Sequence, residues 1–244
     1  MPYRAPLADF RFLLDIVGFS QVAATERFSD ATSDTVEAIL VEAGKLSENT
    51  LAALNRNGDK HPARLENGVV RTSLGFADGY RAIADGGWIG MAASPAFGGM
   101  GLPMTVATCV NDMMGSACLA LQLNPLMTQG QIEALEHHAS DALKALYIPK
   151  LVSGEWCGTM NLTEPQAGSD VGALRSKAAP LGDGSYAITG QKIFITWADN
   201  DFSANVCHLV LARLPDGGDG TKGISLFMVP KIIPDADGNL GARK

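Results

Sequence analysis

Apolar residues in the first part of the chain recur every three or four positions, the spacing that places them on one face of a helix. The clearest run covers residues 36–51, and Thr32 and Ser33 stand just before it, where they can cap a helix. A second run begins after Pro103, and Pro125 is expected to end or bend that helix because proline lacks a backbone N–H. Two shorter helices are expected over residues 129–138 and 141–147.

The pattern changes near Trp156, where short runs of Val, Ile, Leu and Phe replace the helical spacing. Residues 186–188 and 192–196 flank a turn at residues 189–191, which predicts a hairpin. Further strands are expected over residues 156–163, 208–214 and 224–229, with a glycine-rich loop over residues 215–223.

Helices followed by strands predict an α+β fold with two domains, a helical one over residues 1–155 and a β domain over residues 156–244. The composition suits a packed fold, with 46% hydrophobic and 18% charged residues. Lys and Arg number 19 against 26 Asp and Glu, a net charge of −7. The chain therefore has no overall positive field, and nucleic-acid binding is not expected.

The cysteines and the N-terminus indicate the compartment. The four cysteines form no CxxC pair, so free thiols in a reducing environment are expected. The four histidines lack the spacing of metal ligands, so no metal site is expected. Charged residues interrupt any signal-peptide core, and no apolar run reaches transmembrane length. We therefore expect a cytoplasmic protein without a membrane span.

Two segments carry candidate chemistry. Residues 160–170 (MNLTEPQAGSD) include Gly168, which permits close approach of the backbone to a ligand, and Ser169, whose hydroxyl and neighbouring N–H groups suit an anion. On composition alone an ordinary turn is the favoured explanation of the same residues. Residues 190–196 (GQKIFIT) end an apolar run with Thr196, whose hydroxyl can point at a ligand, although Thr is common on strand surfaces.

Together these segments resemble motifs of the acyl-CoA dehydrogenase family, the flavoproteins of fatty-acid β-oxidation. Residues 163–170 resemble the family's flavin loop, and residues 190–196 resemble the strand that lies against the flavin ring. Residues 222–230 (KGISLFMVP) resemble a later strand of the β domain, and the order and spacing of the three motifs agree. Residues 3–12 (YRAPLADFRF) resemble the N-terminal extension of the FadE-type, 3-methylmercaptopropionyl-CoA dehydrogenase-like subfamily.

The resemblance implies a helical N-terminal domain followed by an antiparallel, β-barrel-like middle domain, with the family's C-terminal helical bundle absent from this chain. It implies FAD as the cofactor and an acyl-CoA as the substrate, oxidised to the trans-2-enoyl-CoA by α-proton abstraction and β-hydride transfer to the flavin. An electron-transferring flavoprotein is the implied electron acceptor, and a homo-oligomer is the implied assembly of the full-length protein. The chain by itself is expected to be inactive.

The resemblance also implies roles for single residues. Ser169 is expected to serve the FAD pyrophosphate or the thioester substrate, Phe194 stands where many relatives have a tryptophan near the flavin ring, and Thr196 is expected near flavin N5. No catalytic residue is assigned, because the family's glutamate base belongs to the C-terminal part. Glu155 is expected to be a solvated turn residue, and Glu164 a structural hydrogen-bond acceptor. The implied cofactor-binding set is Met160, Leu162, Thr163, Gly168, Ser169, Phe194, Ile195 and Thr196.

Three alternatives stay open at this point. An acyl-CoA oxidase on the same fold differs in its access to oxygen, which the sequence does not reveal. A non-catalytic binding or assembly domain is the reading favoured if the gene itself ends at Lys244. A scaffold without a cofactor predicts a protein that stays colourless in excess FAD.

Overall fold

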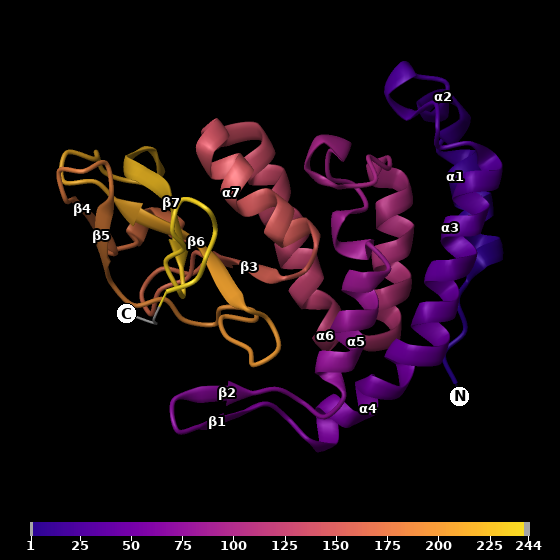
Figure 1. Ribbon diagram of the computed structural model, residues 1–244, viewed down its shortest axis with the longest axis horizontal. Coiled ribbons are helices and arrows are strands. Elements are labelled where there is room, and N and C mark those ends of the chain that lie inside the picture. Colours follow the sequence, from indigo (N-terminus) through magenta and orange to yellow (C-terminus); the bar gives the residue numbers. More distant parts are fainter. Residues whose placement is uncertain (1, 242–244) are drawn as a thin grey trace.

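A computed structural model describes residues 2–241 of the chain. Figure 1 shows the helices packed on one side and the larger sheet on the other, with a small hairpin projecting below them. The expected α+β fold is confirmed, while the division at residues 155 and 156 stays a prediction. The helices are α1 Leu7–Ile16, α2 Phe19–Ala23, α3 Ser33–Leu46, α4 Ala52–Lys60, α5 Phe76–Asp85, α6 Met104–His138 and α7 Asp141–Val152. The strands are β1 Arg64–Glu66, β2 Val69–Arg71, β3 Trp156–Asn161, β4 Lys177–Pro180, β5 Tyr186–Thr189, β6 Asn205–Arg213 and β7 Ile224–Pro230.

The first expected helix forms and begins where its capping residue predicts. Thr32 is the N-cap of α3, and its hydroxyl accepts the backbone N–H of Thr35 at 3.2 Å. The helical run continues through a π-helical turn at Ser47–Leu51 directly into α4. One face of this run is buried against the other helices, which explains its apolar periodicity.

Helix α6 breaks at Cys118 and continues past Pro125, so the expected end of the helix at the proline is wrong. Cys118 has φ −154° and ψ 83°, whereas Pro125 lies inside the helix. The amides of Asn111 and Gln129 meet at 2.8 Å. Residues 18 apart would be about 27 Å apart in a straight helix, so the two halves fold back on each other. Gln122 also donates to Asn111 at 2.8 Å, and these buried amide bonds offset the helical bonds lost at the break.

This reversal bears on the question of a membrane span. By length and composition α6 passes as a membrane-crossing helix, and it is the one candidate in the described residues. Half of its most apolar window is buried inside the protein. The apolar composition of α6 is therefore explained by packing between its own halves and the neighbouring helices.

The larger sheet is mixed and not purely antiparallel, which corrects the expected strand arrangement. Strand β6 pairs in parallel with β3 and, at one position, with β4, while β7 pairs antiparallel with β6. Parallel neighbours require a long crossover connection, and the segment between β3 and β6 is long enough to supply it. This long segment contains both motifs that the sequence singled out.

The predicted hairpin between residues 186–188 and 192–196 is wrong. Strand β5 pairs antiparallel with β4 instead, and residues 190–196 leave the sheet. Gly190 passes so close to Ser176 that an added Cβ would lie 2.1 Å from its hydroxyl oxygen. The chain then adopts a left-handed conformation at Phe194, with φ 56°, which a strand cannot accommodate.

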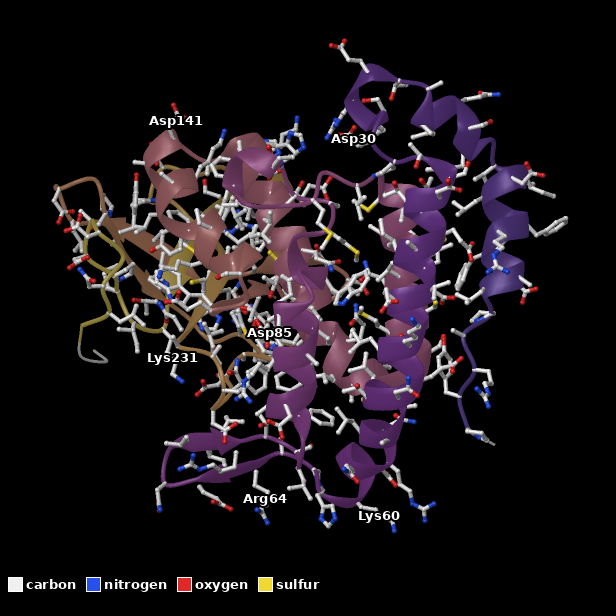
Figure 2. The ribbon with its side chains drawn as sticks, turned by 45° about the vertical axis from the view of Figure 1, so that its right-hand side comes forward. Asp30, Lys60, Arg64, Asp85, Asp141 and Lys231 are labelled. Atoms are coloured by element: carbon white, nitrogen blue, oxygen red, sulfur yellow. The ribbon has the colours of Figure 1, made fainter. Side chains whose placement is uncertain are left out.

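The N-terminal part is not all-helical, which corrects a second expectation. Strands β1 and β2 form a hairpin whose turn residues, Asn67 and Gly68, have φ of 53° and 76°. An Asn-Gly pair is the strongest short signal for such a turn, so this hairpin was predictable from the sequence. Figure 2 shows the hairpin, which carries Arg64, extending away from the helices.

The larger sheet rests on the second half of α6. Thr128 accepts the backbone N–H of Gly158 at 2.9 Å, and Gln131 donates to the carbonyl of Cys207 at 3.1 Å. Trp156 and Cys157 of β3 and Cys207 of β6 belong to the same buried cluster as the apolar side chains of the helices. This contact fixes where β3 ends, and the first motif begins at that end.

Candidate functional site

The two motifs lie side by side. The backbone N–H of Ile193 donates to the carbonyl of Thr163 at 2.9 Å, and the ammonium of Lys192 donates to the carbonyl of Leu162 at 3.1 Å. The loop that leaves β3 and the segment that follows β5 therefore form one surface, although 30 residues separate Leu162 from Lys192.

Glu164 holds this surface together. Its carboxylate accepts the backbone N–H groups of Arg175 at 2.6 Å and Ser176 at 3.0 Å, and the Gln166 amide at 2.7 Å. It also pairs with the Lys192 ammonium at 2.9 Å, with side-chain exposures of 3% for Glu164 and 10% for Lys192. This arrangement is that of a structural acceptor.

The environment keeps Glu164 ionised. Burial alone would raise its pKa, but hydrogen bonds from Ser176, Arg175 and Lys192 outweigh burial and lower the pKa to about 2. A carboxylate held this way is a weak base and is closed off from substrate. Glu155, by contrast, is exposed and pairs with Lys150 at 2.7 Å on the surface, as expected of a solvated turn residue.

We expect acid to weaken the fold through Glu164. Its pKa is about 2 in the folded protein, against about 4.3 in an unfolded chain. The ionised carboxylate therefore stabilises the fold above about pH 4.3, and this contribution, about 3 kcal/mol, is lost as the pH falls toward 2. Urea unfolding between pH 6 and pH 3 measures this loss. A Glu164→Gln variant should lack this part of the pH dependence, and an unchanged slope in that variant would contradict the assignment.

The turn after Glu164 leaves the backbone open at Gly168. Glu164 and Ala167 exchange two backbone hydrogen bonds, at 2.9 and 3.0 Å, and Ala167 is buried. A Cβ added to Gly168 would meet nothing within 4 Å, and Ser169 is exposed. A ligand can therefore approach the main chain at Gly168 and Ser169.

Phe194 is an aromatic ring held in solvent. Its side chain is 90% exposed, and its φ of 56° is strained for a bulky residue, as is the φ of 54° at Trp197. Such conformations cost on the order of 1–3 kcal/mol each and cluster at ligand sites. The Phe194 ring, the open backbone at Gly168 and the residues Thr163 and Thr196 all lie on the two joined motifs.

The structure joins some of the site residues expected from the resemblance and leaves others without a contact to one another. Thr163 and Leu162 are bonded to the second motif through their carbonyls, and Ile195 and Thr196 follow Phe194 on that motif. Ser169 and Thr196 share no hydrogen bond in the described part of the chain. Of the remaining two residues, Met160 is half-buried on β3, and Gly168 is exposed in the loop that follows β3.

Sequence reasoning missed the residues that fix this surface to the helices. Trp197 donates its indole N–H to the carbonyl of Ala120 at 2.9 Å. Asp201 accepts the hydroxyl of Thr72 at 2.7 Å. Two large aromatic residues, Trp197 and Phe202, in an otherwise polar loop were the available signal, because isolated aromatic residues in loops usually pack on something.

A cavity of about 410 Å³ lies between the halves of α6. Both apolar and polar side chains line it. Leu126 and Gly130 line it from the second half of α6, about 9 and 15 Å along the helix axis from Ala120, which Trp197 contacts. The other apolar lining residues include Ile89, Leu102, Met104, Ala107 and Ile132, and the polar ones Arg27, Glu133 and His137. Among residues 2–241 no three His, Cys, Asp or Glu side chains are grouped to hold a metal ion.

Comparison with known proteins matches nearly the whole chain to one family. The family model "Acyl-CoA dehydrogenase, N-terminal domain" matches residues 45–155, and "Acyl-CoA dehydrogenase, middle domain" matches residues 159–243. The chain is 43% identical over 244 residues to 3-methylmercaptopropionyl-CoA dehydrogenase of Ruegeria pomeroyi, covering all of this chain and 42% of that protein. It is 35% identical to the broad-specificity linear acyl-CoA dehydrogenase FadE5 of Mycobacterium tuberculosis, covering 96% of this chain and 39% of that protein.

The fold is similar to solved structures as well. An acyl-CoA dehydrogenase complexed with FAD from Bacillus anthracis superposes with a TM-score of 0.67 at 19% identity, covering 83% of this chain and 32% of that one. The chain spans less than half the length of the curated relatives that it matches.

Proposed function

Because this chain belongs to the acyl-CoA dehydrogenase family, we propose that it forms the flavin-binding part of an FAD-dependent enzyme that oxidises acyl-CoA thioesters to trans-2-enoyl-CoA products. The observation that carries the proposal is the junction of Thr163 with Ile193, which brings the two flavin motifs of the family onto one surface beside the exposed Phe194 ring. FAD, when bound, supplies the acceptor for the hydride.

The residues of this chain have distinct tasks in the proposal. Phe194 provides an apolar face against which the ring lies, and it shields that face from water. The hydroxyls of Thr163 and Thr196 bind polar edges of the ring, where donors stabilise developing negative charge. The open backbone at Gly168 and the Ser169 hydroxyl bind the FAD pyrophosphate or the thioester.

The proton-abstracting base is assigned to no residue of this chain. Glu164 is unsuited because four donors hold it ionised and buried, and Glu155 lies in a surface ion pair. More than half of the length of the curated relatives lies outside the matched region. Electron-transferring flavoprotein as acceptor and a homo-oligomeric assembly belong to the same proposal, on the strength of the family resemblance. A cytoplasmic location is proposed from the free cysteines and the charged N-terminal segment.

The acyl chain is assigned to the cavity between the halves of α6. Leu126 and Gly130 line this cavity from the second half of α6, the half whose Ala120 carbonyl accepts the Trp197 indole N–H. Each methylene that becomes buried is worth about 0.8 kcal/mol, or about fourfold in Kd. Affinity should therefore rise with acyl length until the cavity is filled.

A variant at Gly130 tests this assignment. Gly130 lines the cavity, and an added Cβ meets nothing within 4 Å. We expect Gly130→Leu to fold well, because leucine favours a helix over glycine by about 0.8 kcal/mol, and to abolish the gain in affinity for long acyl chains. Binding of butyryl-, octanoyl- and dodecanoyl-CoA by calorimetry measures this. Gly130→Ala is the matched control and should keep the gain; equal affinities for all three acyl-CoAs in the unaltered chain would overturn the assignment.

A further inference from the structure

Trp197 connects the ring-binding surface to the helices. Its indole N–H donates to the carbonyl of Ala120 at 2.9 Å, and Ala120 lies just after the break in α6 at Cys118. The side chain is half-buried, and its φ of 54° is one that tryptophan rarely adopts. A bulky residue keeps such a conformation only where its contacts outweigh the strain.

Those contacts include an aromatic cluster. The Trp197 ring lies 6.1 Å from that of Phe76 on α5 and 5.6 Å from that of Phe202. Phe202 in turn lies 4.6 Å from Tyr80, also on α5. Ring pairs at these distances attract one another beyond the area that they bury. The loop that follows the second motif is thus packed onto α5 through four aromatic rings.

A polar contact fastens the same loop farther along. Asp201 accepts the hydroxyl of Thr72 at 2.7 Å and its backbone N–H at 3.3 Å, and it pairs with Arg71 at 3.6 Å. These groups lie at the base of the β1–β2 hairpin. Of these two contacts, that of Trp197 is the nearer to Phe194, three residues away, and that of Asp201 is the more distant one.

Residues 193–197 have no strand partner to hold their shape. On one side, Ile193 is bonded to Thr163, and on the other side Trp197 is bonded to Ala120. Phe194, Ile195 and Thr196 lie between these two points. The Ile195 carbonyl also accepts the backbone N–H of Ala198 at 3.4 Å. The two anchors therefore hold the two ends of the segment that carries Phe194 and Thr196, and of the two only the Trp197 anchor reaches the helical part.

We infer that Trp197 is a positioning residue: by binding the Ala120 carbonyl and packing on Phe76 and Phe202, it holds Phe194–Thr196 in the geometry that receives the flavin ring. The inference rests on the proposed function for the identity of the ligand. It adds a residue outside the motifs of the family resemblance, and it makes flavin binding depend on contact with the helices.

The experiment compares Trp197→Phe, which keeps a ring for packing but removes the N–H donor, with Trp197→Ala. Trp88→Phe is the matched control, since Trp88 is buried and belongs to none of the ring pairs that Trp197 and Phe202 make. Hydrogen exchange of the Ile193 and Ala198 amides, which donate to the carbonyls of Thr163 and Ile195, is measured on the FAD-free chain, and the FAD dissociation constant is measured by flavin fluorescence. For Trp197→Phe we expect exchange at least threefold faster at these residues and FAD binding about fivefold weaker, the equivalent of one hydrogen bond. Trp197→Ala should change both the exchange rates and the FAD dissociation constant by more than Trp197→Phe does. Trp88→Phe should change neither quantity.

The two measurements separate this inference from the proposed function. Unchanged exchange of the Ile193 and Ala198 amides in Trp197→Phe would overturn the anchoring role, and faster exchange with an unchanged FAD dissociation constant would overturn the positioning role. If the unaltered chain binds no FAD, the proposed function fails on that result, while the exchange measurement still decides whether Trp197 anchors the segment.

Discussion

Replacing Glu164 by alanine is expected to lower the free energy of unfolding by about 3–5 kcal/mol. The change leaves the Lys192 ammonium, 10% exposed, without its partner, and it leaves the buried backbone N–H groups of Arg175 and Ser176 unpaired. A loss of this size is a large part of the total stability of a typical domain. Urea denaturation at neutral pH measures it.

Two variants control this prediction. Glu155→Ala removes an exposed carboxylate that pairs with Lys150, and it should change stability by at most about 1 kcal/mol. The double variant Glu164→Ala with Lys192→Met removes both buried charges and should recover part of the loss. Equal effects of Glu164→Ala and Glu155→Ala would contradict the structural role assigned to Glu164.

Replacing Phe194 by alanine is expected to affect binding and not stability. The free energy of unfolding should change by at most about 0.5 kcal/mol, and FAD binding should weaken by about ten- to a hundredfold. Stability is insensitive because the ring is 90% exposed and buries almost nothing in the FAD-free protein. Binding is sensitive because stacking of a flat ring on an aromatic side chain is worth about 1–3 kcal/mol. Flavin fluorescence titration and thermal unfolding measure the two effects separately.

Leu65→Ala is the matched control for Phe194→Ala. Leu65 is 74% exposed on β1, outside the proposed flavin surface, so its loss removes an exposed apolar side chain without touching that surface. FAD affinity should be unchanged in this variant. If Phe194→Ala binds FAD as tightly as Leu65→Ala, the ring has no role in flavin binding.

The helices were predictable where their signal is local. The apolar spacing over residues 36–51 and the Thr32 cap both correspond to α3 and its continuation, because a buried helix face and a capping hydroxyl act within a few residues. The break in α6 was not predictable at Cys118. That break depends on the amides of Asn111 and Gln129 meeting across the fold, a contact between residues 18 apart.

The strands show the same division. An apolar run at residues 192–196 suggests a strand, but the side chain of Lys192 is directed to Glu164 and the carbonyl of Leu162. Tertiary contacts therefore outweigh local strand preference. The two ligand motifs were recognisable as residues, whereas their junction through Thr163 and Ile193, and the Trp197 contact with Ala120, depend on the crossover between β3 and β6.

A crystal structure of this chain grown with FAD tests the central claim most directly. The account predicts a flavin ring in van der Waals contact with Phe194, with its polar edges on the hydroxyls of Thr163 and Thr196. A ring bound in the cavity between the halves of α6, or at any surface that leaves Phe194 exposed to solvent, would contradict it.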